Sequence, residues 1–240
     1  MYKNYIFDLY GTLVDIRTNE SSGYLWKKMQ EFYGFHGAKY TSIELRRAYA
    51  RLCKQEEEMV KRKGLSEIQI EKVFNELFVE KDIVVSADVI YTACEFFRII
   101  STKYIKLYDG VIELFEELKK KDKRIYLLSN AQKVFTEPEI KYLGIWNYFD
   151  GIFISSNEQC KKPSSDFFNA LIKKYGLNVK ESIMIGNDGT SDIKGACGVG
   201  MDSLYIRTDI SPQEEKTEDV AATYVISDGD FRKICTLVLK

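Results

Sequence analysis

The chain has few of the residues on which several enzyme classes depend. It contains one histidine, His36, so a histidine-rich zinc site is excluded and any Ser-His or Cys-His hydrolase would depend on that residue alone. His36 lies in the stretch FYGFHGAKY, which is typical of a surface or packing histidine. The five cysteines are scattered, with no pair at metal-ligand or redox spacing, and we expect them to be reduced thiols.

Excess charge of one sign and long apolar runs are missing as well. Lys and Arg total 35 against 36 Asp and Glu, and this balance does not favour a nucleic acid or an anionic membrane as a partner. The most apolar stretch, residues 89–100, contains Glu95 and Arg98 and is shorter than the roughly 18 residues that span a bilayer. No signal-peptide pattern precedes the first strand pattern. We therefore expect a cytoplasmic protein, a monomer or homodimer, that acts on a small anionic molecule.

Hydrophobic periodicity predicts an α/β fold. Residues 4–9 form a short buried-strand pattern. After residue 106, helical patterns such as 109–121 and 164–176 alternate with strand patterns at 124–130, 151–156, 182–188, 203–206 and 223–227. Repeated strand–helix units favour a Rossmann-like core, with a doubly wound parallel sheet and right-handed crossovers.

The block between these two parts has few Gly, no Pro and mostly helical periodicity. We therefore expect an all-helical cap inserted after the first strand, at residues 16–105, with the core at 1–15 and 106–240. Within the block, Ser66-x-x-Gln69 predicts a capping box at the start of a helix. The apolar face of that helix would contain Ile70, Val73, Phe74 and Leu77.

Polar residues follow several of the predicted strands. In doubly wound sheets, ligands bind beyond the carboxyl ends of the strands. These positions hold Asp8 after the first strand, Ser129 and Asn130 after the second, and Asn187, Asp188 and Asp192 after the fourth, while Lys162 precedes Pro163 at the start of a helix. Carboxylates, a hydroxyl and an ammonium at one sheet edge suit covalent attack on an anionic substrate.

The chemistry of this set can be stated residue by residue. The Asp8 carboxylate could attack phosphorus or carbon and form an intermediate that water cleaves. Mg²⁺ held by Asp8 and Asp188 would reduce the repulsion between nucleophile and substrate. Lys162 would neutralise further charge, and Ser129 with nearby backbone N–H groups would hold the transferred group. Thr12 can hydrogen-bond the loop or Asp8.

Four stretches in this order, DLYGTLVD, LLSN, KKP and GNDGTSD, resemble the motifs of the haloacid dehalogenase-like (HAD) hydrolase superfamily. The helical block resembles the cap of the branch that has a cap after the first motif, so the resemblance covers essentially the whole chain. It implies Asp8 as nucleophile, Ser129 as phosphate-binding hydroxyl, Lys162 as charge-stabilising lysine and Asp188 as metal ligand. It also implies the backbone carbonyl of Tyr10 as a metal ligand and Asp192 in a supporting role. The candidate catalytic set is Asp8, Tyr10, Thr12, Ser129, Asn130, Lys162 and Asp188.

Tyr10 departs from the phosphatases of this family, which carry an aspartate there as general acid and base. Dehalogenases of the family have tyrosine at this position, since a departing halide needs no proton, but they lack an acid equivalent to Asp188. The motifs therefore favour an Mg²⁺-dependent phosphatase that acts on a small phosphorylated metabolite through an aspartyl-phosphate on Asp8. A 2-haloacid dehalogenase and a catalytically idle member that binds a phosphometabolite remain as alternatives.

Arginines of the cap region are candidates for binding the substrate anion. Arg17 follows the first motif, and Arg47 and Arg51 belong to a basic cluster that could equally be a solvated helix face. The cap aromatics Tyr24, Trp26, Phe32, Tyr33 and Phe35 favour a cap core over a substrate site. All of these assignments require the Asp8 carboxylate and the Lys162 amine to lie within about 10 Å of each other.

Overall fold

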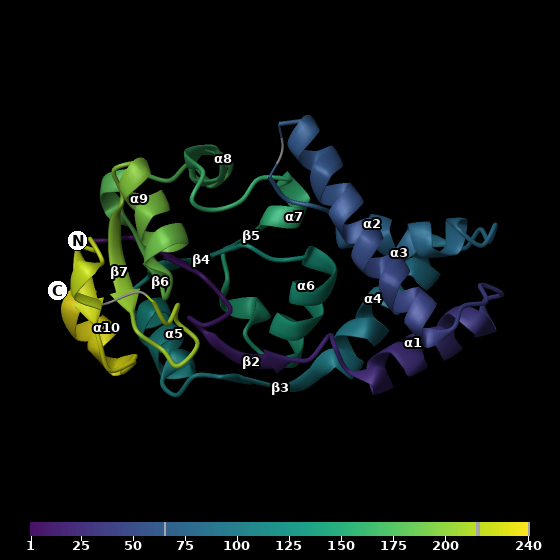
Figure 1. Cartoon of the computed structure of the whole chain (residues 1–240). Helices are drawn as coiled ribbons and strands as arrows, with labels where there is room; N and C mark the ends of the chain where they lie inside the picture. Colours follow the sequence, from purple (N-terminus) through teal and green to yellow (C-terminus); the bar gives the residue numbers. More distant parts are fainter. Residues whose placement is uncertain (65, 215–216, 240) are drawn as a thin grey trace.

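The computed structural model describes residues 1–64, 66–214 and 217–239. Its core is a parallel sheet in the order β5-β4-β1-β6-β7-β8 (Figure 1). The strands are β1 (Asn4–Phe7), β4 (Arg124–Ser129), β5 (Gly151–Ile154), β6 (Ser182–Gly186), β7 (Asp202–Ile206) and β8 (Tyr224–Ile226). The predicted doubly wound parallel core is thus confirmed, with strands that end one to two residues earlier than some of the sequence patterns.

The register of the central strands brings the first, second and fourth predicted strand ends together. Phe7 of β1 lies opposite Leu127 of β4 and Ile185 of β6. Because the three strands are parallel, Asp8, Ser129 and Asn187 follow neighbouring positions at one edge of the sheet.

Helices cover both faces of this sheet. One face packs on α5 (Val111–Lys120) and α10 (Arg232–Val238), and α5 lies within the helical pattern predicted at 109–121. The other face packs on α8 (Ser165–Tyr175) and the short α9 (Lys194–Gly198). Period-2 alternation of apolar side chains explains the two clusters, because Tyr5 and Phe7 face the first and Ile6 faces the second. The remaining core helices are α6 (Lys133–Tyr142) and α7 (Ser155–Glu158).

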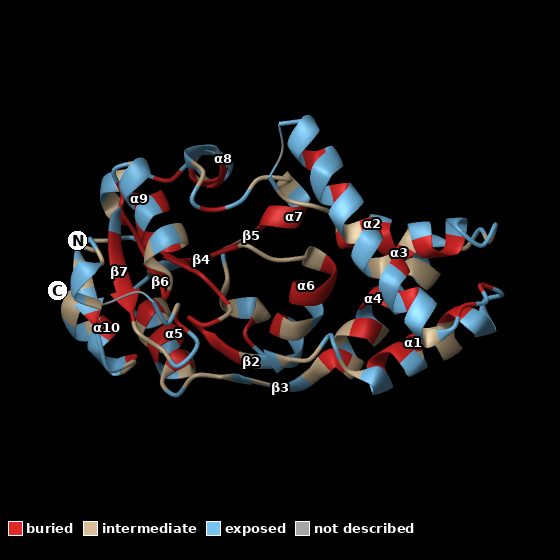
Figure 2. Ribbon diagram, viewed as in Figure 1, coloured by how far each residue is buried: buried red, intermediate tan, exposed pale blue. Residues whose placement is uncertain are grey.

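The cap is a separate group of four helices to one side of the sheet (Figure 1). These are α1 (Gly23–Phe35), α2 (Ser42–Arg62), α3 (Ile70–Val79) and α4 (Ala87–Ser101). They enclose an apolar cluster that also includes Val134 and Phe135 of α6. The predicted face of Ile70, Val73, Phe74 and Leu77 is buried in it, and Figure 2 shows buried segments on α3. Trp26 and Tyr33 join this cluster, whereas Tyr24 and Phe35 are exposed.

The expected all-helical block is wrong at both of its ends. An antiparallel ribbon of β2 (Val14–Thr18) and β3 (Thr102–Leu107) connects the core to the cap. Only three residues of β2 and four of β3 lie inside the predicted block, and their strand pairing depends on partners almost 90 residues away. Local periodicity therefore carried no signal for the ribbon.

The predicted capping box at Ser66 is also wrong. Helix α3 begins at Ile70 with Gln69 as its N-cap and no side-chain cap. The Ser66 hydroxyl instead accepts a hydrogen bond from the backbone N–H of Lys161 in the core, at 3.1 Å. A residue pattern that would start an isolated helix is used here to attach the cap to the core.

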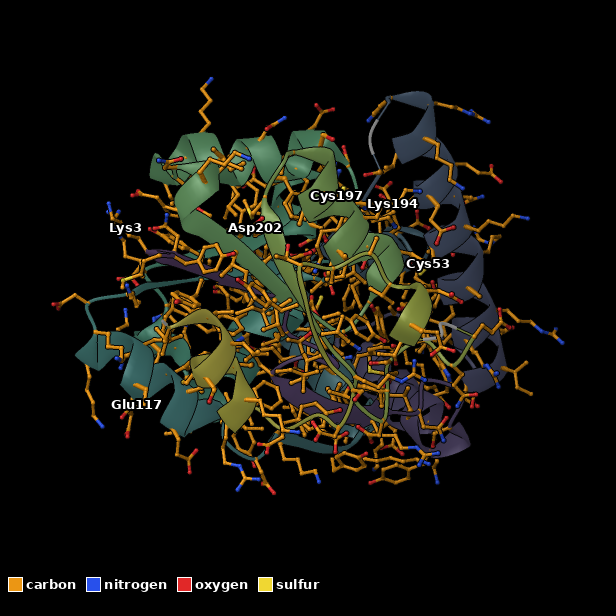
Figure 3. All side chains as sticks on the ribbon, turned by 90° about the vertical axis from the view of Figure 1, so that its left-hand side faces the viewer. Lys3, Cys53, Glu117, Lys194, Cys197 and Asp202 are labelled. Carbon is orange, nitrogen blue, oxygen red and sulfur yellow. The ribbon has the colours of Figure 1, made fainter. Side chains whose placement is uncertain are left out.

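The cysteines are free thiols in separate places. Figure 3 marks Cys53 on the cap helix α2 and Cys197 on the core helix α9. His36 is exposed after the end of α1, where its ring packs against Phe32. Among the described residues, no helix combines the length and the apolarity needed to cross a membrane.

Candidate active site

Lys162 lies at the centre of the cluster of strand-end residues. Its Nζ is 2.6 Å from Asp8 Oδ1 and 2.7 Å from Asp192 Oδ1, and it donates to the Leu128 carbonyl oxygen at 2.8 Å. All three charged side chains are buried. Burial lowers the pKa of Lys162, but the charges of Asp192 and Asp8 outweigh this effect and leave the pKa raised. Lys162 is therefore an ammonium shared by two carboxylates, and the Asp8–Lys162 separation meets the distance condition set by the sequence.

Asn130 fixes the backbone from which Lys162 extends. Its Oδ1 accepts from the Lys162 N–H at 2.8 Å, and its Nδ2 donates to the Lys162 carbonyl at 3.0 Å. The Lys162–Pro163 peptide bond is cis, and α8 begins at Ser165 after the N-cap Ser164. Asn130 is thus a positioning residue for Lys162 in this structure, rather than a group aimed at substrate.

The loop after β1 holds Asp8 from the other side. The Thr12 hydroxyl lies 3.1 Å from both Asp8 Oδ2 and Asn187 Oδ1. Gly11 has φ of +84°, and a Cβ there would lie 2.4 Å from the Asn187 amide nitrogen. Only glycine permits this turn and this close approach. Asn187, a strand-end residue outside the candidate catalytic set, is therefore in contact with the loop that carries Asp8.

Ser129 and Asp192 lie deeper in the cluster. The Ser129 hydroxyl is buried and has no hydrogen-bond partner in the described part of the chain. Asp192 Oδ2 accepts from the Asp188 N–H at 3.2 Å, and a Cβ at Gly186 would lie 2.2 Å from the same oxygen. A buried hydroxyl without a hydrogen-bond partner costs free energy unless a ligand supplies the partner, so Ser129 is suited to donate to a substrate oxygen.

The Asp188 side chain is held by donors of its own turn. Its Oδ1 accepts from the Thr190 N–H and hydroxyl and from the Ser191 N–H, within the turn that follows β6. Burial raises the pKa of Asp188, but these hydrogen bonds outweigh it and the pKa is lowered. The residue in contact with Thr12 is Asn187, and the signal that could have found it is its place directly after a buried strand.

The residues present are compatible with a small, hard cation. Asp8 and Asp188 supply carboxylate oxygens, Asn187 supplies an amide oxygen, and no hydrogen bond among the described residues ends on the Tyr10 carbonyl. Mg²⁺ prefers such oxygen ligands and keeps several waters, so two carboxylates and a carbonyl suffice. Among the described residues, no group of three or more His, Cys, Asp or Glu side chains forms a metal-binding cluster.

The Tyr10 side chain belongs to a polar cluster at the junction of cap and core. Its hydroxyl donates to Glu139 of α6 and lies 3.1 Å from the Thr136 hydroxyl. Glu139 accepts from Arg98 of the cap helix α4 at 2.5 Å, and the Arg98 guanidinium lies 5.6 Å from the Tyr10 ring. Burial raises the pKa of the Tyr10 phenol, and the charge of Glu139 raises it further. The phenol is therefore a neutral donor that is already engaged.

The described contacts do not bring the three candidate arginines to Asp8. Arg17 is exposed on β2 in register with Tyr104, and Arg47 is exposed on α2 beside α1. Arg51 binds Glu80 of the cap at 2.5 Å. Their role in substrate binding stays a prediction that these positions do not support.

Comparison with known proteins decides the family. A family model described as haloacid dehalogenase-like hydrolase matches residues 2–200. The chain belongs to this family. Among curated relatives, the glyceraldehyde 3-phosphate phosphatase of Methanothermobacter thermautotrophicus is 28% identical over 98 residues, 41% of this chain and 43% of that protein. The chain spans about half the length, or less, of the curated relatives it matches.

Solved structures of HAD proteins share the fold over the full length. The magnesium-bound putative HAD-hydrolase YfnB of Bacillus subtilis has a TM-score of 0.56 at 17% identity and covers 100% of this chain and 99% of its own. The L-2-haloacid dehalogenase of Xanthobacter autotrophicus has a TM-score of 0.57 at 15% identity and covers 99% and 100%. This chain thus shares its fold with a magnesium-bound putative hydrolase and with a dehalogenase.

Proposed function

We propose that this HAD hydrolase is a phosphatase that acts on a small phosphorylated metabolite. The observation that carries the proposal is the buried Lys162 ammonium between Asp8 and Asp192, next to strand ends that include the unpartnered Ser129 hydroxyl. A cation beside the nucleophile and a free donor beside it suit an anionic phosphoryl group. Curated relatives named as phosphatases, such as the glyceraldehyde 3-phosphate phosphatase, give further support.

The reaction would proceed in two steps on Asp8. An Asp8 carboxylate oxygen attacks phosphorus, the bond from phosphorus to the leaving oxygen breaks, and an aspartyl-phosphate forms. Water then attacks the same phosphorus, which releases inorganic phosphate and regenerates the carboxylate. Lys162 offsets negative charge on the transferred group, and Ser129 donates to one of its oxygens. Asp8, the Tyr10 carbonyl and Asp188 would hold Mg²⁺, which would reduce the repulsion between the carboxylate and the phosphate.

Tyr10 is not the proton donor in this proposal. Its hydroxyl is bonded to Glu139, and its pKa is raised, so it is a poor acid for a departing alkoxide. The leaving oxygen would take its proton from water, at a cost of roughly 10²–10⁴-fold in rate for a poor leaving group. Substrates whose leaving oxygen is a weak base, such as aryl and acyl phosphates, would lose little.

A metal-independent 2-haloacid dehalogenase is the second candidate. One observation favours it, the phenol of Tyr10 in place of an acid. The test is to assay the purified chain on an aryl phosphate, with Mg²⁺ and with EDTA, and on 2-chloropropionate. We expect metal-dependent phosphate release that Asp8→Asn abolishes; halide release in EDTA without phosphate turnover would reverse the order of the candidates.

The idle-scaffold alternative has its own test in Tyr10→Asp. An idle site that is otherwise intact should gain phosphatase activity, whereas a specialised enzyme should lose part of its own. A cytoplasmic location and a monomeric or homodimeric state stay predictions.

A further inference from the structure

A cavity of about 570 Å³ lies between the cap and the core loops of the active site. On the core side its lining includes Gln132 and Lys161, which are close neighbours in sequence of Asn130 and Lys162. On the cap side its lining comes mainly from α2, which runs along the side of the cap near α7 (Figure 1). The size suits a small metabolite, and the position is beside the groups that hold Asp8.

The α2 residues of this cavity form one stripe. Tyr49, Cys53, Glu57 and Lys61 all line it and are spaced by four residues, so they lie on the same face of the helix. The stripe is about 18 Å long, from an aromatic end at Tyr49 to a cationic end at Lys61. Ser66, whose hydroxyl binds the Lys161 N–H, also lines the cavity a few residues beyond Lys61.

Two carboxylates from different elements reach the cavity without a bonded cation. Glu57 comes from α2, and Glu20 comes from the segment between the ribbon and α1. Both acids influence the Cys53 thiol, whose pKa is raised mainly by burial and further by their charges, so they lie near the same part of the stripe. In the described ranges neither carboxylate has an ion pair or a side-chain hydrogen bond.

The third acid of the lining, Glu67, is engaged elsewhere. Its carboxylate accepts from the Ser155 hydroxyl at 2.9 Å and from Gln132 Nε2 at 3.3 Å, and both contacts attach the cap to the core. Glu20 and Glu57 are therefore the acids available to a ligand. Lys61 and Lys161, which also line the cavity, offer cations toward the end near Lys162.

From this distribution of charge, and on the basis of the proposed phosphatase function, we propose that the substrate is a phosphorylated amine. Its phosphoryl group would lie at Asp8 and its ammonium group between Glu20 and Glu57, with the carbon skeleton between these two positions. An ammonium there would interact with two exposed acidic side chains that line the same cavity. The substrate class is a phosphate ester with a primary amino group.

A matched pair of aryl esters tests this inference with the same type of leaving group. We would measure kcat/KM in Mg²⁺ for 4-(aminomethyl)phenyl phosphate and for 4-(hydroxymethyl)phenyl phosphate, at low salt. We expect the ammonium ester to be preferred by about 10-fold, and the preference to shrink at high salt. Glu57→Gln and Glu20→Gln should each reduce the ratio mainly through the ammonium ester, while Glu58→Gln, one position along α2 and outside the cavity, should leave it unchanged.

The outcomes separate the inference from the function on which it rests. Equal turnover of the two esters, or a preference for the neutral one, would overturn the amine proposal and leave the phosphatase proposal standing. A preference that survives in both glutamine variants would also overturn the assignment to Glu20 and Glu57. If neither ester is hydrolysed in Mg²⁺, both the phosphatase proposal and this inference are contradicted.

Discussion

The contacts among Tyr10, Glu139 and Arg98 allow a prediction of how substitutions there change the stability of the fold. Replacing Tyr10 by Phe removes one hydroxyl that donates to a largely buried carboxylate, while Glu139 keeps its ion pair with Arg98 at 2.5 Å. A hydrogen bond to a charged group contributes about 1.5–3 kcal/mol, and no charge is left unpaired. We therefore expect the free energy of unfolding to fall by that amount. Glu139→Gln should cost more, about 3–5 kcal/mol, because the Arg98 side chain is 16% exposed and would lose its charge partner.

Urea unfolding is the assay, followed by circular dichroism and by tryptophan fluorescence. Trp26 reports on the cap and Trp146 on the core, so coincident transitions would support two-state analysis. Tyr142→Phe is the matched control, since Tyr142 lies on the same helix as Glu139 and is 78% exposed. It should change stability by no more than about 0.5 kcal/mol.

The same variant separates a structural tyrosine from a catalytic one. If the phenol only joins cap and core, kcat of Tyr10→Phe on an aryl phosphate should stay within a few-fold of the wild type. A loss of about 10²–10⁴-fold would mean that the phenol moves a proton in the reaction. That result, or a stability equal to that of Tyr142→Phe, would refute the reasoning from the Glu139 contact.

Three further predictions concern the site and the cavity. Gly186→Ala should lower the free energy of unfolding by about 1–3 kcal/mol and remove most of the activity, because the new Cβ would lie 2.2 Å from Asp192 Oδ2. The control Gly34→Ala on α1, where a new Cβ meets no atom within 4 Å, should be neutral or slightly stabilising. Equal urea midpoints for the two variants would contradict this prediction. Phosphatase rates should depend steeply on leaving-group pKa across aryl and alkyl phosphates, and a flat dependence would indicate a proton donor. Partial burial raises the pKa of the Cys53 thiol to about 11, so at pH 8 an aromatic disulfide reagent should label exposed Cys197 first. Faster labelling of Cys53, read by mass spectrometry, would argue against the raised pKa.

The sequence predicted those parts of the fold that local burial determines. The face of Val73 and Phe74 in α3, and the strand of Tyr5 to Phe7, show the periods that a buried helix face and a buried strand impose on any chain. The positions of Asp8 and Ser129 followed from the same logic, since parallel strands place their carboxyl ends at one edge. The parallel topology alone is therefore enough to predict that these side chains lie close together.

The parts that could not be predicted depend on partners distant in the sequence. Ser66 has the local chemistry of a helix cap, yet it binds Lys161, which lies 95 positions away. Arg98 interrupts an apolar helix, and only its partner Glu139, 41 positions away, explains why a charge is tolerated there. Arg51 illustrates the converse, because a residue that looked available for substrate is paired with Glu80. Tertiary packing determines which polar groups become hydrogen-bond or ion-pair partners, and the local sequence does not show these partners.

Two contact regions of different strength join the cap to the core. One is the Arg98–Glu139 ion pair with Tyr10, which is largely buried and lies beside the ribbon. The other is the loop before α3, where hydrogen bonds without an ion pair join the Ser66 hydroxyl to Lys161, and the Ile70 backbone and the Glu67 carboxylate to Gln132. Hydrogen bonds of the second kind exchange with water at little net cost, whereas parting a buried ion pair exposes two desolvated charges. A cap displacement that spares the ion pair and releases the loop therefore costs least, and it would open the cavity at its Lys161 end, next to the nucleophile.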